Sequence, residues 1–169
     1  LGSYNEYLAV LSYFFEEPWE KLVDGLETSW AIQVLNWAGF SLRAIGRFSE
    51  ASAPMKANIE IAEKNEDWLE AALGANNFSE LKLFSGNIAG AIETGINGLN
   101  LVKKSGNKFQ ELINTATLAN SYLQNLEIKK SKELFEIAEN KKSIVDIKNK
   151  KLNSLYGFFY CDFLLSYGS

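Results

Sequence analysis

Apolar and polar residues follow the period of an α-helix along most of the chain. The stretch from Leu118 to Glu139, for example, consists of two amphipathic runs with a short break between them. Prolines occur only at Pro18 and Pro54, so few positions interrupt this pattern. The pattern predicts an all-α protein, with helices near residues 4–16, 29–46, 49–64, 67–85, 88–105, 108–125, 127–140 and 143–167.

A forty-residue repeat links the segments that begin at Gly46, Gly86 and Leu126. An amphipathic run ends just before each start. Five residues after the starts come the small residues Ala51, Ala91 and Ser131, and nine residues after them come Met55, Gly95 and Phe135. Small residues let paired helices approach closely, and one hairpin cannot bury its own apolar face. The repeat therefore predicts helical hairpins that stack in series.

The repeat resembles the tetratricopeptide repeat in its order of bulky, small and aromatic positions. The matching residues are Ala38, Gly39, Leu42, Gly46, Ala51 and Met55 in the first unit, Phe78, Ser79, Gly86 and Ala91 in the second, and Leu118, Ala119, Tyr122, Ser131, Phe135 and Ala138 in the third. The second unit departs from the pattern, because Lys82 replaces an aromatic residue and Gly95 a bulky one. The forty-residue spacing is longer than the family's common one, and it resembles the spacing in kinesin light chains and in MalT-like bacterial signalling ATPases.

The resemblance implies a right-handed α-solenoid of about three full repeats plus a terminal helix. Tyr160, Cys161, Leu164 and Gly168 would belong to the first helix of a fourth unit, although their register falls two residues late. Residues 1–3 (LGS) are typical of the scar of a cleaved expression tag, and the aromatic C-terminal segment indicates a piece of a larger protein. We expect an N-terminal helix and an irregular link within residues 4–28, and the repeat domain in residues 29–169.

The composition argues against most enzyme chemistry. The chain has no histidine, which removes the commonest general base and metal ligand. Cys161 is the single cysteine, and its apolar neighbours predict a buried, inert thiol. The glycine-rich stretch GNIAGAIETG lacks the lysine of a phosphate loop. Glu60 and Glu63 are one helical turn apart, a spacing more often found on solvated surfaces than in catalytic pairs. We expect no enzyme activity, no metal and no cofactor.

Charge is distributed unevenly along the chain. Residues 1–100 carry 14 acidic and 6 basic residues, and residues 101–169 carry 7 acidic and 11 basic ones. Eight of these bases are Lys129, Lys130, Lys132, Lys141, Lys142, Lys148, Lys150 and Lys151. Acidic residues are interleaved with these lysines, which indicates a solvated helix surface more than a nucleic-acid site. Apolar runs are shorter than the roughly 20 residues of a membrane span. We therefore expect neither nucleic acid nor membrane as a partner, and a cytoplasmic location.

The resemblance also implies that the first helix of each hairpin presents one face to a protein or peptide. Helical spacing places Gln33, Asn36, Phe40 and Arg43 on this face in the first unit, Asn76, Glu80 and Leu83 in the second, Thr117, Asn120 and Gln124 in the third, and Phe158 and Asp162 in the last helix. An asparagine amide can both donate to and accept from a peptide backbone. Alternatively, these asparagines satisfy local backbone groups. The predicted binding residues are Asn36, Phe40, Arg43, Asn76, Glu80, Asn120, Gln124 and Asp162.

The leading functional hypothesis is a non-enzymatic scaffold that binds a protein or peptide. The alternative is a sensor or regulatory arm of a larger bacterial signalling ATPase, which would bind intramolecularly. Gly90, Gly95 and Gly98 lie in one predicted helix and mark either a close helix crossing or a hinge. The aromatic end, from Tyr156 to Phe163, predicts an exposed apolar surface through which the chain could dimerise.

Overall fold

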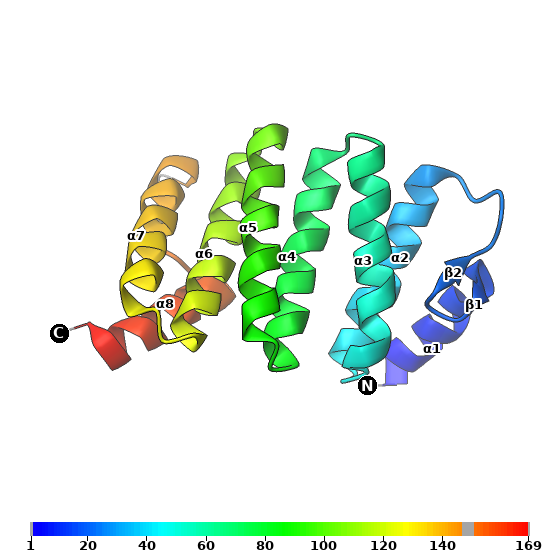
Figure 1. The fold of residues 1–169 in the computed structure, drawn as a ribbon, viewed down its shortest axis with the longest axis horizontal. Helices are drawn as coiled ribbons and strands as arrows, with labels where there is room; N and C mark the ends of the chain where they lie inside the picture. The colour runs from blue at the N-terminus through cyan, green and yellow to red at the C-terminus, as the bar shows by residue number, and fades with distance from the viewer. Residues whose placement is uncertain (1, 147–150, 169) are drawn as a thin grey trace.

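The computed structural model describes residues 2–146 and 151–168 and consists mainly of helices packed side by side (Figure 1). Its first part contains α1 (Gly2–Leu11), a 3-10 turn (Ser12–Phe14), β1 (Phe15–Glu17) and β2 (Lys21–Leu22). The helices that follow are α2 (Thr28–Ala44), α3 (Phe48–Lys64), α4 (Trp68–Phe84), α5 (Ile88–Ser105), α6 (Lys108–Gln124), α7 (Ile128–Val145) and α8 (Ser154–Tyr167). The prediction of a helical protein with serially packed helices is confirmed.

The N-terminal segment differs from the prediction in two ways. Helix α1 ends at Leu11, earlier than expected, and the supposed irregular link contains the antiparallel pair β1–β2. Phe15 and Trp19 are buried against each other there, with ring centroids 5.3 Å apart. Two strands of three and two residues are too short to show an alternating pattern in the sequence, so the hairpin was missed.

Three hairpins make up the body of the fold: α2 with α3, α4 with α5, and α6 with α7. Within each hairpin a three-residue turn joins the helices, and the middle residue adopts a left-handed conformation: Gly46 (φ 82°), Gly86 (φ 80°) or Leu126 (φ 59°). A left-handed residue ends a helix and redirects the chain, and glycine adopts this conformation at least cost. The starts of the sequence repeat are therefore the turns of the three hairpins.

The starts of three successive helices are fixed by capping side chains. Asp67, Asn87 and Asn107 each accept a hydrogen bond from the backbone N–H three residues later, at distances of 3.2, 3.0 and 2.9 Å. Such caps satisfy backbone donors that lack a partner within the first turn of a helix. Each substitution of a cap of this kind by alanine typically costs about 1 kcal/mol.

The small residues of the repeat lie where the paired helices approach each other. Ala51, Ala91 and Ser131 are fully buried. The Ser79 hydroxyl donates to the Ala91 carbonyl at 2.8 Å, which joins α4 to α5. A methyl group added at Gly98 would lie 2.8 Å from Asn114 Nδ2. Helix α5 is continuous from Ile88 to Ser105. These contacts favour close packing as the role of the glycines in α5.

Helices α2, α4, α6 and α8 contact one another in that order, while α3, α5 and α7 lie in front in the view of Figure 1. We call the surface formed by α2, α4 and α6 the first-helix face, because these are the first helices of the three hairpins. Beneath it, one apolar core extends from the N-terminal segment through the first two hairpins. A second core joins α6, α7 and α8 around Phe135 and Phe163.

The last helix departs from the predicted register. A single helix over 143–167 was expected, but α7 ends at Val145 and α8 begins at Ser154. Cys161, predicted to be buried, is exposed. The apolar residues of α8 are spread around the helix instead of forming one stripe, so periodicity does not indicate which side faces the protein. Its buried residues are Gly157 and Phe163.

Most of the clustered lysines that the structure describes lie among acidic partners. Lys130 pairs with Glu127 at 2.5 Å, Lys141 with Glu111 at 2.8 Å, Lys142 with Asp146 at 2.9 Å and Lys151 with Glu139 at 3.3 Å. Lys142 is buried, contrary to the expected solvated surface. Lys148 and Lys150 lie outside the described residues. Across the described helices, none combines the length and the apolar character needed to cross a bilayer.

Candidate protein-binding face

A partly buried ion pair joins the first two hairpins at the first-helix face. Arg43 of α2 places Nη1 2.6 Å from Glu80 Oε2 of α4, and the two side chains retain 14% and 9% of their exposure. The same Arg43 nitrogen donates to the Asn77 carbonyl at 3.4 Å. Glu80 also accepts from Asn76 Nδ2 at 3.4 Å. Three of the predicted binding residues therefore form one hydrogen-bonded group.

Two more predicted residues of α2 lie beside this group. Asn36 accepts a hydrogen bond from Asn77 Nδ2 at 3.4 Å. Phe40 lies under the Arg43 guanidinium, 5.3 Å from ring centroid to Cζ, and 6.4 Å from the ring of Tyr4. Phe40 remains exposed despite these contacts. The α2 residues thus present an aromatic ring to solvent next to an ion pair that is already formed.

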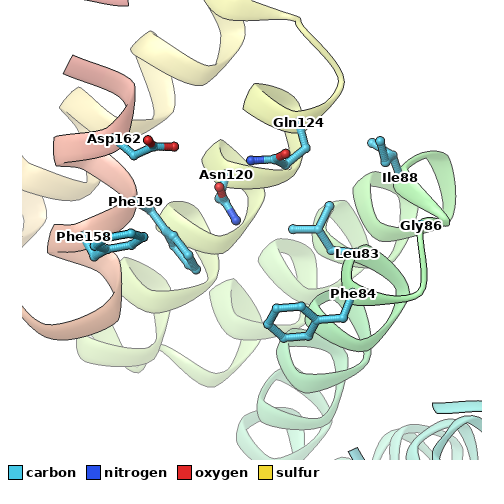
Figure 2. Close-up of a pocket in the computed structure, with 9 residues that line it drawn as sticks. All are labelled: Leu83, Phe84, Gly86, Ile88, Asn120, Gln124, Phe158, Phe159 and Asp162. Carbon is cyan, nitrogen blue, oxygen red and sulfur yellow. The ribbon is translucent and has the colours of Figure 1, made fainter. Parts of the chain in front are cut away.

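The remaining predicted residues surround a pocket of about 390 Å³ between α4, α6 and α8 (Figure 2). Asn120 and Gln124 reach it from α6, and Asp162 from α8. The other lining residues are apolar or lie at the turn after α4: Leu83, Phe84, Gly86, Ile88, Phe158 and Phe159. The pocket is therefore mainly apolar, with polar groups from α6 and one carboxylate from α8.

A second pocket of about 320 Å³ lies between α2, the start of α3, α4 and the start of α8. It is lined by Phe40, Arg43, Ala44, Phe48, Glu80, Phe84 and Leu155. Phe84 belongs to both pockets, so the two adjoin along the C-terminal ends of α2 and α4. Together they form a largely apolar strip that includes exposed aromatic rings.

Tyr156 of α8 is partly buried. Burial raises the pKa of its phenol to about 12; the negative charge of Glu80 adds to this effect and Arg43 opposes it. The hydroxyl therefore stays protonated across the physiological range and can act as a hydrogen-bond donor. The neighbouring Leu155 lines the second pocket, which places the start of α8 near side chains of α2 and α4.

The predicted residues differ in how accessible they are. Asn76, Glu80 and Asn120 are buried, with 6%, 7% and 6% of their surface exposed, whereas Phe40, Gln124 and Asp162 are exposed. Among the described residues, Asn76 Oδ1 has no hydrogen-bond partner. Direct recognition of a peptide backbone by the asparagines stays a prediction.

Sequence reasoning missed several residues of this face. Phe48, Phe84 and Leu155 line the two pockets, and Asn77 links Asn36 to Arg43. The usable signal was the position of Phe48 and Phe84 beside the hairpin turns. Phe158 and Asp162 of α8 were assigned to this face, but Leu155 had no signal, because its position depends on a contact between distant parts of the chain.

No family model matches the chain, and no curated protein sequence is significantly similar to it. Within residues 2–146 and 151–168, no group of three or more acidic, cysteine or histidine side chains is arranged to hold a metal ion. The functional argument consequently rests on the shape and chemistry of the first-helix face.

Proposed function

We propose that the chain is a non-enzymatic, tetratricopeptide-like scaffold that binds a segment of a partner protein on the first-helix face. In this proposal the hairpins form a right-handed solenoid, and the partner occupies the apolar strip between α2, α4, α6 and α8. The carrying observation is the pair of adjoining pockets that share Phe84. Pockets that combine apolar walls with a few polar groups are the usual sites of ligand binding.

The charges of the strip support a protein partner over a charged small ligand. Arg43 and Glu80 neutralise each other at 2.6 Å, so neither offers an open charge to a substrate. Phe40 and Phe158 offer exposed aromatic surface instead. Buried aromatic anchors surrounded by polar groups are typical of the energetic centres of protein interfaces.

A selection with random peptides tests this proposal. A phage-displayed peptide library is panned against the immobilised full chain, and selected peptides are measured against Phe84→Glu and Ile96→Glu. Ile96 is a matched control, because it is an exposed apolar residue of α5 that lines neither pocket. We expect binding to wild type and Ile96→Glu and loss of at least about tenfold on Phe84→Glu. Failure to select binders, or equal binding to all three proteins, contradicts the proposal.

The alternative, a regulatory arm of a signalling ATPase, is favoured by one observation. Helix α8 of the same chain already lies on the first-helix face, so an intramolecular segment can occupy it. If the chain acts in this way, Phe84→Glu should change nucleotide hydrolysis when it is introduced into a parent protein that carries a Walker motif. Unchanged hydrolysis would leave the scaffold as the better proposal.

A further inference from the structure

Helix α8 reaches further across the first-helix face than serial stacking requires. A helix that followed α7 in simple series would contact α6 and α7. Helix α8 does contact both, and its Phe163 ring lies 5.7 Å from the Phe135 ring of α7. Its first turn, however, reaches the first two hairpins of the chain. Leu155 lines a pocket with residues of α2, α3 and α4, including Phe48 and Phe84. Phe158 and Phe159 point across the other pocket toward Leu83 of α4 (Figure 2).

The chemistry of α8 matches that of the surface it borders. Its sequence, SLYGFFYCDFLLSY, is apolar and rich in aromatic residues, with Asp162 as its one charged side chain. The strip beside it is lined by Phe40, Phe48 and Phe84, of which Phe40 and Phe84 remain exposed, and by an ion pair that is internally neutralised. A charged segment that bound there would lose its hydration without gaining an ionic partner, which costs free energy. An apolar helix has no such desolvation cost.

Helix α8 is nevertheless held by a small part of its surface. Gly157 and Phe163 are its buried residues, while Leu155, Phe158, Leu164 and Leu165 are exposed, Leu165 by 88%. The first-helix residues Leu35, Leu42 and Ala119, by contrast, are almost completely buried. Elements with few buried apolar contacts open at low free energy. Helix α8 is therefore the part of the repeat domain that is easiest to displace.

We infer that the first-helix face is a receptor for an aromatic, weakly charged α-helix of a partner protein, and that α8 is its intramolecular occupant. The inference rests on the proposed function and specifies its ligand: a helix with large apolar side chains for the two pockets, in the places of Leu155, Phe158 and Phe159. A partner helix binds by displacing α8. This mode is helix-in-groove recognition, in which apolar anchors recur at helical spacing.

The tether explains how occupancy would control affinity. Because α8 belongs to the same chain, its effective concentration at the face is of millimolar order. A free helix of equal intrinsic affinity therefore competes poorly with it. The apparent dissociation constant is the intrinsic one divided by the fraction of molecules whose face is open. A substitution that weakens the attachment of α8 should therefore increase the affinity of the first-helix face for a separate helix, although the face itself is unchanged.

The test uses the full chain and a labelled peptide of residues 152–168. The peptide carries Cys161→Ser to prevent disulfide formation and a terminal lysine tag for solubility. Its binding is measured by fluorescence anisotropy against wild type, Leu155→Glu and Phe163→Ala, with Ile96→Glu as the control. Leu155 is an exposed residue of α8, so its substitution loosens α8 while the hairpin core is untouched, and it keeps the test decisive if Phe163→Ala unfolds. Circular dichroism verifies the fold of each variant.

We expect Leu155→Glu and Phe163→Ala to bind the peptide at least about tenfold more tightly than wild type and Ile96→Glu do. Adding Phe84→Glu to Leu155→Glu should remove this gain. Equal affinities for wild type and folded Leu155→Glu overturn the inference. If library peptides still require Phe84 in that case, the proposed function stands and only the choice of ligand fails. If light scattering shows that wild type dimerises through α8, the face binds a second copy of this chain. That result would likewise overturn the inference that it binds a helix of a different protein.

Discussion

The Arg43–Glu80 pair should contribute substantially to the stability of the first-helix face, because it is short and largely shielded from water. The Nη1–Oε2 distance is 2.6 Å, and the side chains are 14% and 9% exposed. Removing one partner of a buried pair costs about 3–5 kcal/mol, since the other charge stays buried without compensation. Because the two side chains keep some exposure, we expect Arg43→Met to lower the free energy of unfolding by about 3 kcal/mol, the lower end of this range. Glu80→Gln should cost less, because an amide can keep the hydrogen bond from Asn76.

A double-mutant cycle isolates the pairwise contribution. Arg43→Met, Glu80→Gln and the double variant are unfolded in urea and followed by far-UV circular dichroism. We expect a coupling free energy of about 2 kcal/mol for residues in direct contact. Lys56 and Glu60 supply the matched control: their charged atoms are 3.7 Å apart and the side chains are 70% and 64% exposed, so their cycle should give less than about 0.5 kcal/mol.

Salt separates the two cases further. At 1 M ionic strength the Debye length is about 3 Å, so the coupling of the exposed pair should vanish while most of the Arg43–Glu80 coupling persists. The reasoning is refuted if the Arg43–Glu80 coupling falls below about 0.5 kcal/mol or disappears in salt like that of the control. Either result would mean that water reaches the pair and that it does not tie the first two hairpins together.

Further substitutions test the packing, the turns and the electrostatics. Gly98→Ala should lower the free energy of unfolding in urea by about 1 kcal/mol despite the better helix propensity of alanine, because its methyl group would lie 2.8 Å from Asn114 Nδ2; a gain in stability would contradict the close crossing. Leu126→Gly should raise it by about 0.5 kcal/mol, because Leu126 has φ 59° and glycine adopts that conformation without strain; a lower urea midpoint would refute this. Hydrogen bonds from Lys141 and Lys108 hold the pKa of the Glu111 carboxyl below its ordinary 4.5, so its stabilising effect is present above pH 4.5 and is lost as pH falls through the folded-state pKa. Glu111→Gln should therefore be destabilising at pH 7, with a difference from wild type that shrinks in acid; a constant difference in urea unfolding across this range would be the contrary result.

The hairpin body could be predicted from the sequence because its signals are local. Gly46 and Gly86 mark turns with left-handed backbone, and the matched residues Ala51 and Ala91 are fully buried as their spacing required. A helix period and a turn residue depend on neighbouring positions in the chain. The predicted boundaries of α2 to α6 consequently differ from the observed ones by at most about two residues, the usual ambiguity of helix ends.

The pairings at the face could not be predicted in the same way. Arg43 and Glu80 were both placed on the first-helix face, but they are 37 residues apart and so do not occupy equivalent positions of the forty-residue repeat. The equivalent of Glu80 in the first hairpin is Phe40, and the equivalent of Arg43 in the second is Leu83. The repeat fixes where a side chain lies, whereas its partner depends on what stands one turn away on the neighbouring helix. This distinction explains why both residues were assigned to one face, and a salt bridge of Arg43 with a neighbour was considered, without Glu80 being identified as the partner.

The backbone turns also mark the point at which α8 leaves the series. Left-handed residues recur at Gly46, Glu66, Gly86, Gly106 and Leu126, twenty residues apart each time, so one helix and its turn make up the backbone period. The next position in this series is residue 146, and there the chain is extended, with φ −134° and ψ 92°. The left-handed residue that ends each earlier helix and redirects the chain is therefore missing at this position. Helix α8 begins at Ser154 and packs against α6 and α7, while its Leu155 lines the strip on the first-helix face. The break in the turn period therefore coincides with the point at which α8 leaves the register of the hairpins.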